Sequence, residues 1–198
     1  MTETELSGRF YKGTKEELLS AIRSQLSDYR YRHVLGVGET CRRLAGLNGV
    51  DPEQAMIAGF VHDYAKEKTD EQFIQKIREK NLDPDLLNWG NFIWHGVVGA
   101  EFIRDELGIT DEEILNAVRR HTVGSPDMTV LDQIVYVSDY VEPNRSFPDV
   151  EIARALAFAD LRQAVVFETK HTLQFLMSSS SRIYPDAILT YNAFVAEK

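Results

Sequence analysis

Residues 58–66 read Ala-Gly-Phe-Val-His-Asp-Tyr-Ala-Lys, an apolar run that ends in an adjacent histidine and aspartate. Asp51 and Pro52 mark a helix start ahead of this run, because aspartate caps a first turn well and proline is tolerated at the first helical position. His62 and Asp63 then lie near the end of that helix. Imidazole nitrogen and carboxylate oxygen together suit a divalent transition metal. The stretch therefore predicts a helical protein with a metal site.

The rest of the chain also has hydrophobic residues at helical spacing, while alternating runs long enough for a strand are hard to find. The expected fold class is all-α, a helical bundle. A threonine followed three residues later by Glu or Gln, the pattern of a capping box, marks further starts at Thr14, Thr69 and Thr110. The predicted helices cover residues 15–27, 29–47, 52–65, 70–80, 95–107, 111–121, 129–141, 151–158, 160–178 and 186–196, with residues 178–181 as the last loop.

Length and composition predict one compact domain: 198 residues, 43% of them hydrophobic. We expect a metal-binding core at about residues 29–145, with C-terminal helices at 151–196 packed on it. The single cysteine, Cys41, excludes an internal disulfide and a thiolate metal cluster. A cytoplasmic protein without a membrane partner is the natural expectation, since we find neither a leader segment nor a long apolar span.

The formal net charge of −9 argues against a nucleic-acid polymer as partner, because duplex binding usually rests on clustered Lys and Arg contacts to phosphates. It does not exclude a phosphorylated small substrate. Metal cations and a few local basic residues can reverse the potential inside a cleft.

Four more residues are candidate metal ligands. His33 shares a helix face with Val37 and should point into the core, where a hydrogen-bonded histidine is the structural alternative. Asp139 lies on the apolar stripe of its helix, so it needs a cation, either a metal or an arginine. His95 and His121 are expected at a helix start and a helix end, where capping or surface roles are the alternatives.

Together these residues supply four imidazoles and two carboxylates, which suits two metal ions. If Asp63 bridges, one ion takes His33, His62 and Asp139, and the other takes His95 and His121. Two such ions lie about 3.5–4 Å apart and can share a hydroxide, so the implied chemistry is metal-assisted hydrolysis. Nitrogen and oxygen ligands permit iron, manganese, cobalt or zinc.

The order His, His-Asp, His, His, Asp resembles the HD-domain phosphohydrolase superfamily. Residues 62–66, 94–100 and 136–145 (HDYAK, WHGVVGA and YVSDYVEPNR) are similar to the bacterial YqeK family, and the similarity extends from Tyr29 to Tyr191. The resemblance implies a helical enzyme with a dinuclear centre, usually of iron. It implies symmetrical hydrolysis of diadenosine tetraphosphate and related dinucleoside polyphosphates to two ADP, by hydroxide attack on an inner phosphorus.

The expected catalytic residues are Asp63, Lys66 and Arg145. Lys66 projects beside the metals if its helix continues, and Arg145 can hold a diphosphate bidentately; a solvated lysine and ordinary ion pairs are the structural alternatives. The expected substrate contacts are Arg30, Lys66, Trp94, Thr122, Asn144 and Arg145. Trp94 could stack on an adenine, but packing in the core is the more common use of such a ring.

Other functions fit the sequence less well. A guanosine-tetraphosphate hydrolase would carry His-Asp-x-x-Glu-Asp, where this chain has Lys66-Glu67, and the Gly-Tyr-Pro signature of a cyclic-dinucleotide phosphodiesterase is absent. An HD-type nucleotidase acting on mono- or deoxynucleotides stays open, as does a metal-dependent nucleotide sensor without turnover. Homodimerisation is compatible with the sequence. His171 fits no ligand spacing and is expected to be an ordinary surface residue.

Overall fold

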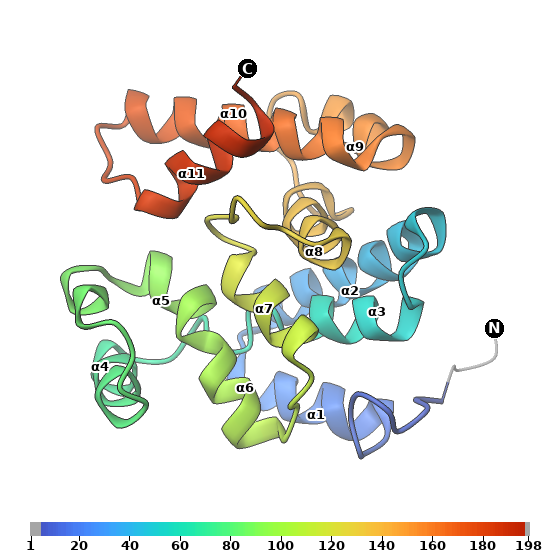
Figure 1. The fold of residues 1–198 in the computed structure, drawn as a ribbon. Coiled ribbons are helices and arrows are strands. Elements are labelled where there is room, and N and C mark those ends of the chain that lie inside the picture. Colours follow the sequence, from blue (N-terminus) through green and yellow to red (C-terminus); the bar gives the residue numbers. More distant parts are fainter. Residues whose placement is uncertain (1–4, 197–198) are drawn as a thin grey trace.

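The structure is a computed structural model that describes residues 5–196 (Figure 1). Within that range the chain forms helices joined by loops, with no strand, which confirms the expected all-α class. The elements are α1 (Lys15–Gln25), α2 (Asp28–Asn48), α3 (Pro52–Val61), α4 (Asp70–Glu79), the 3-10 helix η1 (Pro84–Asn88), α5 (Asn91–Val97), α6 (Gly99–Leu107), α7 (Glu112–Arg120), α8 (Val130–Val141), α9 (Val150–Ala159), α10 (Leu161–Ser178) and α11 (Pro185–Phe194).

Three of the predicted helix starts are confirmed. Thr14 and Thr69 each form a capping box with the residue three positions later. Asp51 caps α3, where its carboxylate accepts hydrogen bonds from the backbone of Glu53 and Gln54 and Pro52 takes the first helical position. These caps satisfy N–H groups that have no partner inside a helix.

The capping box predicted at Thr110 was wrong. The cap of α7 is Asp111, whose carboxylate accepts a hydrogen bond of 3.0 Å from the Ile114 backbone. Aspartate caps at least as well as threonine, and Glu113 accepts from the Gln54 amide at 2.7 Å instead of closing a box.

The single helix predicted over residues 95–107 was also wrong, because α5 and α6 meet at Val98. α5 begins at Asn91, after Gly90, whose carbonyl accepts from Ile93 and Trp94. No side chain caps this start, so the usual sequence signal is missing. His95 therefore lies inside α5 and not at a helix start. The helix η1 was not predicted.

The helix that precedes His62 ends earlier than predicted. α3 stops at Val61, and residues 62–67 form turns in which Lys66 N–H donates to the Asp63 carbonyl at 2.9 Å. Turns closed by a hydrogen bond between residues three positions apart are tighter than the turns of an α-helix. The side chains of His62, Asp63 and Lys66 thus leave the backbone in directions that a continued helix would not give.

Helices α2 and α3 approach each other through two glycines. A Cβ placed on Gly59 would lie 2.8 Å from the Gly38 Cα and 2.8 Å from the Cys41 sulfur. The two backbones are therefore in contact, since real Cβ atoms do not come so close to a neighbour. This crossing brings the chain before and after Gly59 against the helix that carries His33.

Helix α8 lies in the middle of the molecule, with α9, α10 and α11 at one end and α2 and α3 on its other side (Figure 1). It contacts α2, α3, α7, α9 and α10. Asp139 lies near its C-terminal end. The described residues include no helix that is both long and apolar enough to span a membrane.

Candidate metal centre

The six predicted ligands come from five segments that the fold brings together. His33 lies on α2, His62 and Asp63 follow α3, His95 lies on α5, His121 follows α7 and Asp139 lies on α8. All are buried except Asp139, whose side chain is 23% exposed. Residues as far apart as 33 and 139 thus share one site, with one partly open side at Asp139.

Asp63 lies between two pairs of histidines. Its Oδ2 atom is 3.8 Å from His33 Nε2 and 3.7 Å from His62 Nε2, whereas its Oδ1 atom is 3.6 Å from His95 Nε2 and 3.7 Å from His121 Nε2. Each carboxylate oxygen therefore faces a different imidazole pair. A bridging carboxylate between two ions needs this arrangement.

Asp139 adds an oxygen on the His33 side, where its Oδ1 is 3.0 Å from His33 Nε2 and 3.8 Å from His62 Nε2. Two sets of three residues have ligand atoms within 4.8 Å of one another and could each hold an ion: His33, His62 and Asp139, and His62, Asp63 and His121. His62 belongs to both sets by distance.

The donor atoms of this cluster suit a metal. Among the described residues, Nε2 of His33, Nε2 of His62 and Oδ1 of Asp63 are buried and form no well-aligned hydrogen bond. Buried polar atoms are rarely left in this state, because each one costs free energy unless it has a partner. A divalent ion would give all three a partner.

In each of the four histidines, Nδ1, the nitrogen that points away from the centre, has a hydrogen-bond partner. In three of the histidines Nδ1 bonds to a backbone carbonyl of the preceding turn: His62 to Gly59 (2.8 Å), His95 to Asn91 (2.6 Å) and His121 to Val118 (2.7 Å). His33 differs, because its Nδ1 lies 3.1 Å from the Glu142 carboxylate. A hydrogen on Nδ1 leaves the lone pair on Nε2, which is the nitrogen that faces the centre.

Burial favours the neutral form of two of these rings. It lowers the pKa of His62 to about 4 and, with the nearby Lys66 ammonium, the pKa of His95 to about 3. Burial would raise the pKa of Asp63, but the surrounding histidines, His62 first, and the Lys66 ammonium hold it well below its ordinary value. Neutral imidazole and ionised carboxylate are the forms that bind metal.

Three of the predicted substrate residues are cations that contact the centre. Arg30 donates to Asp63 Oδ2 at 2.8 Å, the Lys66 ammonium lies 2.9 Å from His95 Nε2, and Arg145 pairs with Asp139. The Arg30 and Arg145 side chains keep 22% and 31% of their surface exposed. They therefore border the centre on its open side, where an anionic substrate would arrive.

The other predicted substrate residues lie in different surroundings. Thr122 is beside the centre, with its hydroxyl 3.0 Å from His95 Nε2. Asn144 directs its amide to Glu142 Oε2 at 2.8 Å. Trp94 is 3% exposed, packs against Phe73 and donates its indole N–H to the Leu86 carbonyl at 2.7 Å. Trp94 therefore packs in the core, which is the structural role given above as the alternative to base stacking.

Two residues next to the centre had no predicted role. Glu142 is buried behind His33, and Arg154 on α9 donates to the carbonyls of Val141, Glu142 and Arg145. Glu142 lies inside the stretch of residues 136–145 that carries the family resemblance, so that stretch was the available signal. Arg154 had none, because its partners next to the centre are backbone carbonyls. His171 stacks on Phe167 away from the ligand set.

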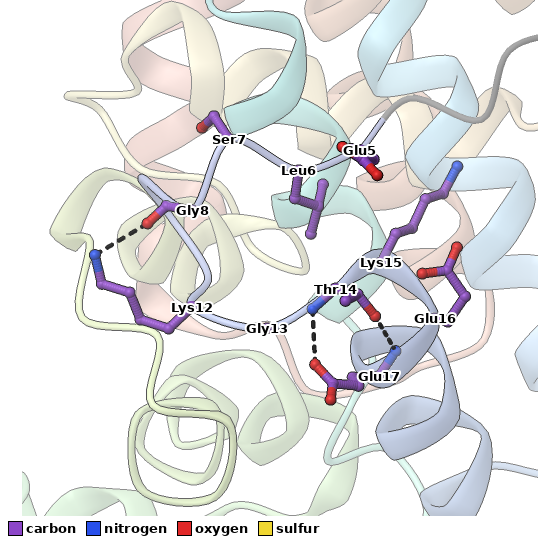
Figure 2. A pocket seen from close by; sticks show the side chains of 10 residues that line it. All are labelled: Glu5, Leu6, Ser7, Gly8, Lys12, Gly13, Thr14, Lys15, Glu16 and Glu17. Atoms are coloured by element: carbon purple, nitrogen blue, oxygen red, sulfur yellow. Dashed lines mark hydrogen bonds between the residues drawn. The ribbon is translucent and has the colours of Figure 1, made fainter.

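A surface pocket of about 830 Å³ is lined by residues 5–8 and 12–17 and includes none of these side chains. Figure 2 shows local contacts among these residues, the Thr14–Glu17 cap and the bond from Lys12 to the Gly8 carbonyl, and Ser7 also donates to the Glu53 carboxylate. Of the titratable groups drawn there, Glu17 belongs to the cap of α1, and none is among the candidate ligands.

Comparison with protein families and known proteins identifies relatives across nearly the whole chain. A family model for the HD domain matches residues 30–144, a span that holds all six candidate ligands. The symmetrical bis(5'-nucleosyl)-tetraphosphatase of Bacillus subtilis is 43% identical over 92% of this chain and 98% of that protein. The protein of the same name from Halalkalibacterium halodurans is 41% identical over 91% of this chain and 96% of its own length.

A solved structure agrees with the fold. A predicted HD superfamily hydrolase involved in NAD metabolism, from Clostridium acetobutylicum, is 33% identical in sequence. It superimposes with a TM-score of 0.86, over 90% of this chain and 95% of that one. The arrangement of helices around the histidine cluster is therefore shared with an experimentally determined relative.

Proposed function

Since the chain belongs to the HD-domain family, we propose that it is a symmetrical bis(5'-nucleosyl)-tetraphosphatase, which hydrolyses diadenosine tetraphosphate to two ADP. The observation that carries the proposal is the position of Asp63, with one oxygen toward each pair of histidines. This geometry supports a dinuclear centre, and relatives that this chain matches over nearly their whole length carry the name of the activity.

The residues that would hold the ions divide into two groups around Asp63. His33, His62 and Asp139 would hold one ion, and His95 and His121 would hold the other. When bound, two divalent ions supply Lewis-acid charge that activates water and offsets the charge of phosphoryl oxygens. Iron is our first choice of metal, and the ligand set also accepts manganese, cobalt or zinc.

The cations at the open side would bind and orient the polyphosphate. Arg145 can grip two phosphate oxygens at once through its planar guanidinium, and Lys66 offers a compact ammonium. The chain as a whole has a net charge of −9, so attraction for a polyanion must come from such local groups. A metal at His95 Nε2 would displace the Lys66 ammonium, which would then be free to meet the substrate.

The proposed reaction is a single displacement. The oxygen of water adds to one of the two inner phosphorus atoms, the central P–O–P bridge breaks in line, and each half departs as ADP after one proton is released. The chain's part is to hold that phosphorus next to Asp63, while Arg145 and Lys66 offset the charge on the departing diphosphate. No covalent enzyme intermediate is needed.

The test is product analysis by anion-exchange chromatography after anaerobically purified, iron-loaded protein meets diadenosine tetraphosphate. We expect ADP as the sole product, and its loss in Asp63→Ala and His95→Ala. His171→Ala is the matched control and should keep the rate, because His171 lies outside the ligand set. AMP plus ATP would show asymmetric cleavage, and turnover of mononucleotides alone would favour a nucleotidase. Near-normal rates in Asp63→Ala would exclude the proposed centre.

We also propose that the protein acts in the cytoplasm on a small dinucleotide, with no nucleic-acid polymer as partner. The net charge of −9 supports the second part. Homodimerisation is a further proposal, which light scattering after size-exclusion chromatography would decide.

A further inference from the structure

The hydrogen bond behind His33 differs in kind from those behind the other three histidines. Its Nδ1 faces the Glu142 carboxylate at 3.1 Å, whereas the others bond to carbonyls within their own segments. A carboxylate partner is charged and makes its histidine a more basic ligand than a carbonyl does. It also joins two elements, because His33 belongs to α2 and Glu142 follows α8.

Both oxygens of Glu142 are engaged. Oε1 faces His33 Nδ1, and Oε2 accepts from the backbone N–H and the side-chain amide of Asn144, each at 2.8 Å. Three donors thus converge on one buried side chain. A glutamine could not serve them all, since its NH₂ group would face a donor on one side or the other.

The turn that carries Glu142 is itself held in place. Arg154 donates to the carbonyls of Val141 at 2.9 Å, Glu142 at 2.8 Å and Arg145 at 2.7 Å. A guanidinium can make these three bonds because its donors are fixed in one plane. Helix α9 therefore fixes the turn that presents Glu142 and Arg145 to the centre.

Helix α2 leaves room for the Glu142 carboxylate at Gly36. A Cβ on Gly36, one turn after His33 on α2, would lie 2.3 Å from Glu142 Oε2 and 3.2 Å from Asn144 Nδ2. The glycine is needed for this close approach. A methyl group there would push the carboxylate away from the ring it supports.

We propose that Glu142 is a positioning residue that fixes His33 as a metal ligand, and that Asn144, Gly36 and Arg154 hold Glu142 for this task. Asn144 then acts through Glu142 and not on the substrate. The inference rests on the metal centre of the proposed function. It does not depend on which phosphate ester is cleaved.

The test is titration of the metal-free full-length protein with Co²⁺ against a chelator, with the visible absorption of bound Co²⁺ as a second readout. Glu142→Gln and Gly36→Ala should each weaken one of two binding steps by about 10- to 100-fold and change its spectrum. The other step should stay near its wild-type value, and the metal-free protein should stay folded.

Two matched variants act as controls. Glu151→Gln removes an exposed carboxylate that pairs with the same Arg154, and Gly46→Ala adds a methyl group on the same helix as Gly36, where no atom lies within 4 Å. Both should keep both binding steps. If Gly36→Ala fails to fold, Glu142→Gln still decides the matter.

Unchanged affinity and spectrum in Glu142→Gln would overturn the proposal. So would the loss of both steps together with a large fall in the melting temperature of the metal-free protein, because that pattern means a purely structural role. A wild-type protein that binds two ions without cleaving diadenosine tetraphosphate would refute the proposed function and leave this inference standing.

Discussion

The Arg145 guanidinium pairs with Asp139, and the Arg145 backbone carbonyl accepts a hydrogen bond from Arg154. Its guanidinium has two uses, since it offsets the charge of a candidate ligand and borders the open side of the centre. Burial lowers the pKa of Arg145, but the Asp139 carboxylate more than compensates, so that the net shift is upward and the group stays cationic.

Replacement of Arg145 by glutamine should reduce kcat/KM for diadenosine tetraphosphate by about 100-fold or more, in the range seen when one charge-stabilising donor is removed from an active site. The measurement is steady-state kinetics at saturating metal. Arg162→Gln on α10 is the control, because Arg162 lies over the Phe194 ring and not at the centre. Equal rates for wild type and Arg145→Gln would show that Arg145 only balances Asp139.

The metal-free protein should lose stability as the pH falls from 7 to 5. Burial lowers the pKa of His62 to about 4 and of His95 to about 3, below the ordinary 6.5. The unfolded chain then binds more protons than the folded one below about pH 6.5, and the free energy of unfolding decreases. For His33, burial lowers the pKa but hydrogen bonds to Asp139 and Glu142 raise it overall, and burial raises the pKa of Glu168; both shifts oppose this trend.

The check is the melting temperature in a metal chelator across that pH range, for wild type and His95→Asn. The melting temperature of His95→Asn should fall less between pH 7 and pH 5 than that of the wild type. A decline in His95→Asn as steep as in the wild type would contradict the assignment of a neutral, buried ring to His95.

The six candidate ligands could be predicted from the sequence because each one is an ionisable side chain that has no reason to be buried alone. The groups behind them could not. Gly59, Asn91 and Val118 contribute only carbonyl oxygens, which every residue carries. Their role depends on the course of the backbone, and side-chain chemistry gives no sign of it.

At the scale of elements, the crossing of α2 and α3 sets the distance between His33 and His62. A methyl group on Gly59 would meet the Gly38 Cα at 2.8 Å, and backbone atoms cannot move aside as a flexible side chain can. The helices would have to separate.

Gly59→Ala should therefore lower the free energy of unfolding by about 1–3 kcal/mol, the usual cost of overpacking a core. That corresponds to a fall in melting temperature of roughly 2–4 °C for each kcal/mol in a chain of this size. Gly46→Ala on the same α2, where a Cβ meets nothing within 4 Å, should instead stabilise the helix by about 0.5–1 kcal/mol. Thermal denaturation of both variants is the measurement. Equal stabilities of Gly59→Ala and Gly46→Ala would mean that α2 and α3 are not in close contact at Gly59.

Three helix starts were predicted from a capping side chain, whereas the start of α5 carries no such signal. Thr14, Thr69 and Asp51 announce their helices, whereas α5 begins after Gly90 with no side-chain bond. The early end of α3 at Val61 was missed for a related reason. The residues that follow would suit a helix, and the turns they form depend on contacts with the rest of the centre.

At the scale of the whole molecule, one hydrophobic cluster includes residues from Phe10 near the N-terminal end to Val165 on α10. α8 joins the two ends, since it contacts both α2 and α10. We propose that the chain is a single cooperative domain.

Unfolding by denaturant should accordingly give one transition at the same midpoint by circular dichroism and by tryptophan fluorescence. Trp89 follows η1 and Trp94 lies in α5, so fluorescence reports on that region. Circular dichroism reports on every helix. A fluorescence midpoint that differs from the circular dichroism midpoint would mean that the region around the tryptophans, which includes the contact of Trp89 with Tyr184, unfolds separately from other helices.

The most direct test of the proposed dinuclear centre is the rate of ADP formation from diadenosine tetraphosphate as a function of ions bound per chain. Metal-free protein would be titrated anaerobically with Fe²⁺, and bound metal and nucleotide products measured in the same samples. The account predicts ADP as the only nucleotide product, with a rate at one ion per chain well below half of the rate at two. A full rate with one ion bound, or AMP and ATP as products, would contradict it.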